Sequence, residues 1–394
     1  MKRLILFLLV TSCVFAAPVQ AAEPQLWFYL PTNLLVDENV DKGIELLNRA
    51  AKAGYNGVLL TDSKFTRWGQ LPDRYEKNVK RFRDECRRLK IDCIAAVCPI
   101  GYSNDILNLD PNLAEGLPVV DAPFIVKNGT LVPEQPAEPI LKNGSFEEYQ
   151  NSRPTSWGFV DEPGKISIID TEIKAHGNVS LRMQEPDNTA PHNRRAMQAI
   201  TVKPFQQYHI SFMMKTENYE SLGDTKVAVL ASDGQSLNWH MPPLKPTEDW
   251  RRIDLTFNSL DNTTLNIYFG TWGARKGKIW WDDITIEPAG FVNILRREGT
   301  PISVKSEDGK TIFAEGNDFD KIVDPKMGTI PYAGCYTAWH EPPVIRIPSG
   351  SRLTEGQKVL VSYYHMSIIY DEQVGACFAD PKFREMLRWQ IEQV

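Results

Sequence analysis

The sequence predicts an α/β fold that is interrupted by an all-β part. In residues 24–110, short apolar runs alternate with amphipathic helical patterns, which is typical of a parallel sheet. In residues 139–288, short runs rich in β-branched and aromatic residues are bounded by Gly, Asn, Asp or Pro, which is typical of a β-sandwich. After residue 357 a strand pattern and a helical pattern return. The chain has 394 residues, 42% of them hydrophobic, which is enough for two or three domains with cores.

The first 21 residues have the pattern of a secretory signal peptide. Lys2 and Arg3 precede a short apolar run, and cleavage after Ala21 fits a small-x-small site. The run is too short to span a bilayer. We therefore expect a secreted or periplasmic protein. A lipoprotein on the cell envelope is the alternative, because the residues that end at Cys13 resemble a lipobox, and lipidation there would tether the protein to a membrane.

The segment that follows, residues 24–110, alternates strands with helices. We expect strands at 26–30, 57–61 and 91–97, and helices at 40–53 and 72–89. The run Ala-Lys-Ala-Gly-Tyr-Asn-Gly-Val at 51–58 resembles the first units of a (β/α)₈ glycoside hydrolase barrel. A doubly wound α/β sheet has the same pattern over three strands, so it is the alternative to a barrel. No G-x-G-x-x-G follows a strand, so a nucleotide-binding sheet has no support.

A Pro-rich stretch, residues 111–138, is expected to be a linker, and residues 139–288 are expected to form an independent β-sandwich. Two motifs bracket the sandwich: Asn-Gly-Ser-Phe-Glu at 143–147 and Trp-Trp-Asp-Asp-Ile at 280–284. Together with Pro154-x-x-Trp157, these motifs resemble the jelly-roll carbohydrate-binding modules of secreted glycosidases, families four, nine and twenty-two among them. The resemblance implies a jelly roll whose partner is a polysaccharide or another glycan.

The same resemblance implies a structural calcium ion. Glu147 and Asp283 match the carboxylate positions of the family's site, and Gly177 matches a backbone-carbonyl position. Hard oxygen ligands of this kind suit calcium. The ion would hold the two ends of the module together and would take no part in catalysis. The alternative is that both carboxylates simply bond loops. No organic cofactor is expected.

Sugar contacts in the jelly roll are expected from aromatic side chains, whose faces stack on the apolar faces of sugar rings. We nominate Trp239, Tyr268 and Trp272 for this role. Three other tryptophans of this segment are expected to lie in the core: Trp157, Trp250 and Trp280.

The last two segments suggest an interrupted barrel. Residues 291–357 predict a small β unit, and residues 358–394 predict a strand and a helix that continue the α/β part. The simplest topology is one barrel whose third loop carries two β insertions. This gives four strand–helix units, whereas a closed barrel needs eight. We therefore expect a partial barrel, either truncated or completed by a second chain. A complete open α/β sheet is the alternative.

Candidate catalytic groups follow the predicted strands. Glycoside hydrolysis usually needs two carboxyl groups, and barrel enzymes carry them at the carboxyl ends of strands. Asp62 follows the second strand, and Asp371 and Glu372 follow the fourth. If the barrel were complete, these residues would favour an O-glycosyl hydrolase. Asp62 and Asp371 could instead begin turns, since Asp accepts backbone N–H bonds well.

Further substrate contacts are expected near the fourth strand. Tyr363, Tyr364 and His365 end this strand, and His340 lies in an aromatic, Pro-rich loop. Aromatic rings there could stack on sugars and imidazoles could donate to hydroxyl groups. The alternative places the tyrosines in a core and makes both histidines structural.

The net charge is −6 and no large Lys/Arg cluster occurs, which argues against a nucleic-acid partner. The first function class is a secreted carbohydrate-active enzyme. The second is a non-catalytic glycan-binding or cell-surface protein with an incomplete barrel, and a structural surface module without a ligand is a third.

Overall fold

The structure is a computed structural model that describes residues 24–97, 105–185, 192–369 and 374–393. The part of the chain that the structure describes divides into two compact units. The first contains residues 24–62 and 70–96, and the second contains residues 63–69 and the rest of the chain from residue 97. The signal peptide, Cys13, Asp371 and Glu372 lie outside the described residues. No helix among the described residues is both long enough and apolar enough to cross a membrane.

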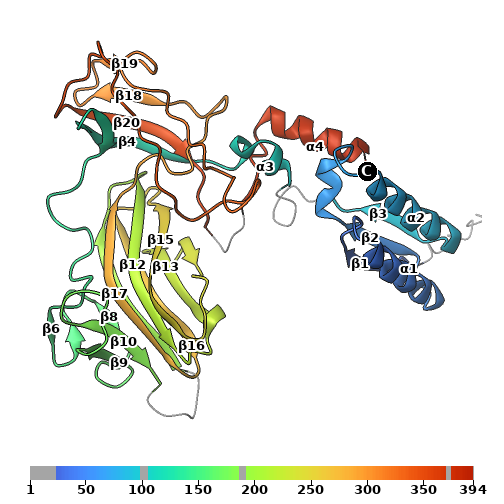
Figure 1. The fold of residues 1–394 in the computed structure, drawn as a ribbon, viewed down its shortest axis with the longest axis horizontal. Helices are drawn as coiled ribbons and strands as arrows, with labels where there is room; N and C mark the ends of the chain where they lie inside the picture. Colours follow the sequence, from blue (N-terminus) through green and yellow to red (C-terminus); the bar gives the residue numbers. More distant parts are fainter. Residues whose placement is uncertain (1–23, 98–104, 186–191, 370–373, 394) are drawn as a thin grey trace, which may run out of the picture. The chain divides into compact units, whose positions relative to one another are not determined.

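The first unit confirms the predicted alternation of strands and helices (Figure 1). A parallel sheet has the order β1-β2-β3. Leu47, Phe82 and Cys86 on the two helices are no more than 1% exposed, so each helix buries its apolar stripe. The elements are β1 (Trp27–Pro31), α1 (Asp37–Lys52), β2 (Gly57–Thr61), α2 (Asp73–Leu89) and β3 (Asp92–Ala95).

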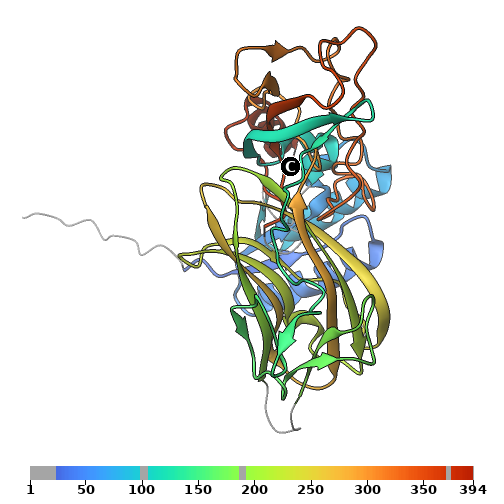
Figure 2. The ribbon, with the colours of Figure 1, turned by 90° about the vertical axis from the view of Figure 1, so that its left-hand side faces the viewer.

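The second unit contains a β-sandwich of two five-stranded antiparallel sheets (Figures 1 and 2). One sheet has the order β15-β12-β17-β10-β9, and the other has the order β14-β13-β16-β11-β8. The strands are β8 (Phe159–Val160), β9 (Ser167–Asp170), β10 (Ser180–Gln184), β11 (His192–Thr201), β12 (Gln207–Glu217), β13 (Thr225–Ala231), β14 (Ser236–His240), β15 (Glu248–Asn258), β16 (Thr264–Ala274) and β17 (Lys278–Pro288).

Aromatic rings fill the space between the two sheets. Phe212 lies 5.5 Å from Phe269 and 5.3 Å from Trp281, measured between ring centroids. Trp157 stacks on Phe146 at 5.1 Å, which connects the Asn-Gly-Ser-Phe-Glu motif to the core. The predicted β-sandwich is therefore confirmed. Phe146 of the first motif and Trp281 of the second pack in its core. A two-stranded hairpin, β6 (Tyr149–Gln150) with β7 (Arg153–Pro154), follows the first motif.

A third antiparallel sheet, of order β19-β18-β20-β4-β5, completes the second unit. Its strands are β4 (Leu117–Lys127), β5 (Thr130–Pro133), β18 (Ser303–Ser306), β19 (Ile312–Phe313) and β20 (Lys358–His365). The small β unit predicted for residues 291–357 is thus part of a larger sheet. Short helices accompany it: η1 (Ser63–Arg67), α3 (Asp105–Leu109), η2 (Pro111–Leu113) and, in the sandwich, η3 (Leu222–Asp224). The predicted C-terminal helix is confirmed as α4 (Pro381–Gln393).

The third sheet corrects two predictions. The expected linker at residues 111–138 contains the β4–β5 hairpin, whose turn at Asn128 and Gly129 has left-handed backbone angles. Pro118 and Pro123 can lie in this strand because, among the described residues, β4 pairs with β20 alone at these two positions. Moreover, β20 pairs antiparallel with β4 and does not continue the parallel sheet. The described residues contain no barrel, and the expectation that a second chain completes one stays a prediction.

Candidate functional site

Four partly exposed side chains and one alanine form a row across one sheet of the sandwich. Trp239 on β14 lies opposite Ala228 on β13, which lies opposite Tyr268 on β16. Tyr268 lies opposite Met197 on β11, and Met197 lies opposite Phe159 on β8. Because directly paired residues project from the same face of a sheet, the row spans all five strands on one face.

This row lies on the outer face of the sheet. The neighbours in sequence, such as Val227 and Ile267, are fully buried and belong to the sandwich core. Since successive residues of a strand point to opposite faces, the side chains of the row point away from that core. Ala228 is also 0% exposed, which is expected if the large rings of Trp239 and Tyr268 on either side cover it.

Trp272 joins the row from the same strand as Tyr268. Its ring centroid lies 5.7 Å from that of Trp239 and 6.2 Å from that of Tyr268. The structure therefore brings together all three residues nominated from the sequence as sugar contacts. Such a group of adjacent rings provides a broad apolar platform with polar edges.

Two cationic side chains lie over these rings. The Lys226 amine is 4.8 Å from the ring centroid of Trp239 and 5.7 Å from that of Trp272. The Arg195 guanidinium is 5.9 Å from the Trp272 centroid and is held by Asp161, whose Oδ2 accepts from Nε at 3.0 Å. These cations stabilise the ring positions through cation–π attraction and supply hydrogen-bond donors beside the apolar surface. We call this set of residues the aromatic face: Phe159, Arg195, Met197, Lys226, Trp239, Tyr268 and Trp272.

One edge of the aromatic face contacts the chain that follows β20. The backbone N–H of Trp239 donates to the carbonyl of Ile369 at 2.8 Å, and the Asn238 side-chain amide donates to the carbonyl of Ile368 at 2.9 Å. Residues 368 and 369 therefore extend along strand β14. Asp371 and Glu372, the catalytic candidates that follow, lie outside the described residues and stay predictions.

The tryptophans assigned to the core divide into two groups. Trp157 is 2% exposed and Trp280 is fully buried, as predicted. Trp250 on β15 is only partly buried and lies on the opposite sheet from the aromatic face, so its assignment to the core was only partly right.

Three of the four candidates near β20 are buried: Tyr363, His340 and His365. Tyr363 is 1% exposed and its hydroxyl donates to Gln207 Oε1 at 2.9 Å. His365 is fully buried and bonded through both ring nitrogens. Tyr364 packs against a small core with α3 and α4. His340 Nε2 lies 2.7 Å from Asp324 Oδ2 and is 8% exposed. His340 and His365 are buried and have partners, so a structural role describes them better than contact with a substrate. Tyr364 is only partly buried and Tyr363 lines a cavity described below, so their assignment as substrate contacts stays a prediction.

Asp62, the catalytic candidate of the first unit, is also structural. Its carboxylate accepts from the Leu34 backbone N–H at 2.8 Å and from the Tyr75 hydroxyl at 3.1 Å, and the residue is 3% exposed. The turn-bonding alternative therefore describes Asp62 better than a role in hydrolysis does.

The three residues of the implied calcium site meet at the loop of residues 175–179. Glu147 Oε1 accepts from the backbone N–H groups of Asn178 at 2.7 Å and Val179 at 3.2 Å, and these bonds lower the pKa of its carboxyl group. Asp283 Oδ2 lies 2.6 Å from His176 Nδ1. Among the described residues no three His, Cys, Asp or Glu side chains form a metal-binding group. A calcium ion here would need backbone carbonyl ligands, and it stays a prediction.

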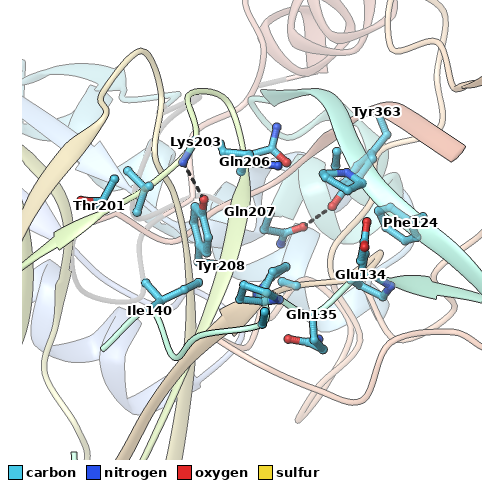
Figure 3. Close-up of a pocket in the computed structure, with 18 residues that line it drawn as sticks. Phe124, Glu134, Gln135, Ile140, Thr201, Lys203, Gln206, Gln207, Tyr208 and Tyr363 are labelled. Carbon is cyan, nitrogen blue, oxygen red and sulfur yellow. Dashed lines mark hydrogen bonds between the residues drawn. The ribbon is translucent and has the colours of Figure 1, made fainter. Parts of the chain in front are cut away.

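A cavity of about 420 Å³ lies between the sandwich and the third sheet (Figure 3). Its walls come from the end of β11, the start of β12 and the end of β17 on one side, and from β4, the segment after β5, and β20 on the other. Sequence reasoning missed this cavity because residues from five separate segments enclose it. The only signal was the prolines at 123, 133, 136 and 288, which line it.

Comparisons with known proteins give distant structural matches. No protein-family model matches the chain, and no curated protein matches it. A family 16 carbohydrate-binding module is 16% identical with a TM-score of 0.29, over 37% of this chain and 98% of that chain. A CBM4 structure is 19% identical with a TM-score of 0.28, over 38% and 99%. TmCBM61 in complex with β-1,4-galactotriose is 15% identical with a TM-score of 0.29, over 39% and 100%.

Proposed function

We propose that the protein binds a polysaccharide through the aromatic face. One observation carries this proposal: Trp239, Tyr268 and Trp272 lie side by side on the outer face of one sheet, with ring centroids about 6 Å apart. All three rings are partly exposed, and a group of adjacent aromatic rings that is left partly in contact with water is typical of a binding site. Sugar rings offer the matching apolar faces.

Hydrogen-bond donors beside the rings support a sugar as the ligand. Lys226 and Arg195 are donors without acceptor groups of their own, and sugar hydroxyl oxygens are acceptors. Stacking provides affinity that tolerates different sugars, while the donors select the hydroxyl pattern. The TmCBM61 structure holds β-1,4-galactotriose, which makes β-1,4-galactan a reasonable first probe for this chain as well.

Hydrolysis has less support than binding. The described residues contain no barrel, and Asp62 is buried in a structural hydrogen-bond network. Asp371 and Glu372 stay catalytic candidates outside the described residues. We therefore propose a carbohydrate-binding protein and do not assign a catalytic pair. Secretion remains part of the proposal, and the N-terminal sequence of the exported protein would test cleavage after Ala21.

Affinity electrophoresis of the full chain tests this function. Native gels would contain β-1,4-galactan, a β-1,4-glucan, a xylan or no polysaccharide. We expect at least one polysaccharide to retard the wild-type protein, and we expect the double substitution Trp239→Ala and Trp272→Ala to abolish the retardation. Equal retardation of a folded double variant would show that the aromatic face is not the binding site.

A further inference from the structure

The cavity shown in Figure 3 has fixed walls. The Val120 backbone N–H donates to the Phe205 carbonyl at 2.9 Å, and the Gln206 side-chain amide donates back to the Val120 carbonyl at 2.7 Å. On the far wall, the Tyr363 hydroxyl donates to Gln207 Oε1 at 2.9 Å. These bonds join the sandwich to the third sheet, so the cavity is already formed without a ligand. Its size, about 420 Å³, is in the usual range for small-molecule sites.

The lining of the cavity favours a neutral ligand with an apolar face. Prolines, alanines and the rings of Phe124 and Tyr208 make up half of the 18 residues of the wall, and Ile140 and Val202 add to its apolar surface. Only two lining residues carry a charge, Glu134 and Lys203, and Glu134 is neutralised by an ion pair with Lys358. Lys203 is exposed, so solvent weakens its attraction for an anion. A charged ligand would therefore lose its hydration here without a buried opposite charge to replace it.

Two buried polar groups of the lining have hydrogen-bonding capacity left. Tyr208 is 4% exposed, and its hydroxyl accepts from the Lys203 backbone N–H at 2.9 Å, which leaves the phenolic proton to donate. Gln206 is 7% exposed, and its side-chain oxygen accepts from no residue in the described part of the chain. One donor and one acceptor match a hydroxyl group, because a hydroxyl both accepts and donates.

Strand β11 connects the aromatic face to the cavity. Arg195, Met197, Ala199 and Thr201 alternate with buried residues, so all four project from the outer face of the sheet. Arg195 and Met197 belong to the aromatic face, whereas Thr201 lines the cavity. Met197 and Thr201 are four residues apart along an extended strand, which corresponds to about 14 Å. A chain of linked sugars that follows β11 would thus reach the cavity.

We propose that the cavity holds the terminal sugar of the polysaccharide whose next sugars stack on the aromatic face. This inference rests on the proposed function, and it adds that the protein recognises a chain end. A pyranose is neutral, has an apolar ring face for the proline wall, and offers hydroxyl groups to Tyr208 and Gln206. Sugars in the middle of a chain carry a linkage on both sides. Phe124 and Tyr363, on the wall made by β4 and β20, are each 1% exposed and belong to the packed core of the third sheet, so a chain that comes along β11 cannot continue through this wall.

The number of protein molecules bound per polysaccharide chain tests this inference. Two size fractions of β-1,4-galactan would be titrated with the full-length protein by calorimetry, or two fractions of whichever polysaccharide retards the protein most. A protein that binds chain ends saturates at the same number per chain for both sizes. A protein that binds only along the chain saturates in proportion to length. We expect equal numbers, and a number that grows with chain length would overturn the inference.

A blocking substitution separates the cavity from the aromatic face. Ala137 lines the cavity and is exposed, so Ala137→Trp can reduce the space in the cavity without disturbing a core. Ala53→Trp is the matched control, because Ala53 is exposed and lies in the first unit. We expect Ala137→Trp to raise the dissociation constant by about tenfold or more. Ala53→Trp should bind like the wild type.

Together with Trp272→Ala, these two variants distinguish the possible failures. If Ala137→Trp binds like Ala53→Trp while Trp272→Ala weakens binding, the cavity has no part in recognition but the aromatic face keeps its function. If Ala137→Trp weakens binding while Trp272→Ala does not, the cavity binds the sugar and the aromatic face does not. If the wild type binds no polysaccharide of the panel, both proposals are wrong.

Discussion

At the scale of single residues, Gly177 shows how closely the loop around Glu147 is packed. Gly177 has a φ of +62°, and a Cβ atom built on it would lie 2.1 Å from Glu147 Oε1. The same oxygen accepts the backbone N–H groups of Asn178 and Val179. A larger residue at position 177 would therefore have to displace the carboxylate that orders this loop.

We expect Gly177→Ala to destabilise the sandwich by about 1–3 kcal/mol, because it combines an unfavourable left-handed alanine with the loss of the Glu147 hydrogen bonds. Gly223→Ala is the matched control, since Gly223 has open space around it and no left-handed backbone angle. Urea unfolding of both variants, followed by tryptophan fluorescence, measures the difference. Equal midpoints for Gly177→Ala and Gly223→Ala would contradict this account of the loop.

Single residues were predictable where strand alternation decides their environment. Tyr268 alternates with Ile267 and Phe269, which are buried, so a strand pattern alone indicates that it faces outward. Asp62 and His365 were not predictable in this way. Their partners, Tyr75 and Asn258, are brought to them by tertiary structure, and a polar residue at a strand end has the same local sequence whether it is buried or exposed.

At the scale of elements, strand β20 ends in a buried neutral histidine. His365 Nδ1 lies 3.1 Å from the Met366 carbonyl, and Nε2 lies 2.9 Å from the Asn258 side-chain amide nitrogen. The Asn258 oxygen accepts from the Leu260 backbone N–H, which fixes the amide so that its N–H groups face the imidazole. The neutral ring therefore accepts at Nε2, and a protonated ring would place two donors against each other.

Burial lowers the pKa of His365 from 6.5 to about 4. Between these values the unfolded chain binds a proton that the folded protein does not, so stability falls as the pH drops from 6.5 to 4. The shift corresponds to about 3 kcal/mol of lost stability at pH 4. We expect His365→Gln, which cannot titrate, to lose less stability over this range. Parallel decreases for the two proteins in urea unfolding at several pH values would contradict the prediction.

Elements were predictable where amphipathic periodicity was strong, as in α1, α2 and α4. The β4–β5 hairpin was missed because its prolines were taken as evidence against strands, although Asn128-Gly129 is a typical hairpin turn. The partner of β20 could not be predicted at all. Its apolar run suits a parallel or an antiparallel neighbour, and the neighbour, β4, lies more than 230 residues away in the sequence.

At the scale of the whole molecule, the loop of residues 175–179 connects the two ends of the sandwich. Glu147 comes from the first motif of the module and Asp283 from the last, and both contact this loop. If calcium binds here through these carboxylates and nearby carbonyls, a chelator should lower the melting temperature of the protein. The effect of a ligand at a hundredfold excess over its dissociation constant is about 3 kcal/mol. An unchanged melting temperature would exclude the metal and leave the fold as it is.

The whole-molecule topology was predicted only in part. The jelly-roll sandwich was predictable because its short strands and turn residues are local signals, and its motifs pack into the core. The fourth unit of the partial barrel was wrong because counting strands does not reveal which strands pair. In the structure the chain forms a three-stranded parallel sheet and a separate antiparallel sheet that includes β20.

The central claim, that the aromatic face binds a polysaccharide, is tested most directly by the affinity of Trp272→Ala. A buried aromatic anchor contributes about 2 kcal/mol, so isothermal titration with the preferred oligosaccharide should show binding weaker by about 30-fold. Trp250→Ala is the control, because Trp250 is partly exposed on the opposite sheet and should bind like the wild type. A Trp272→Ala protein that is folded and binds as tightly as Trp250→Ala would contradict the claim.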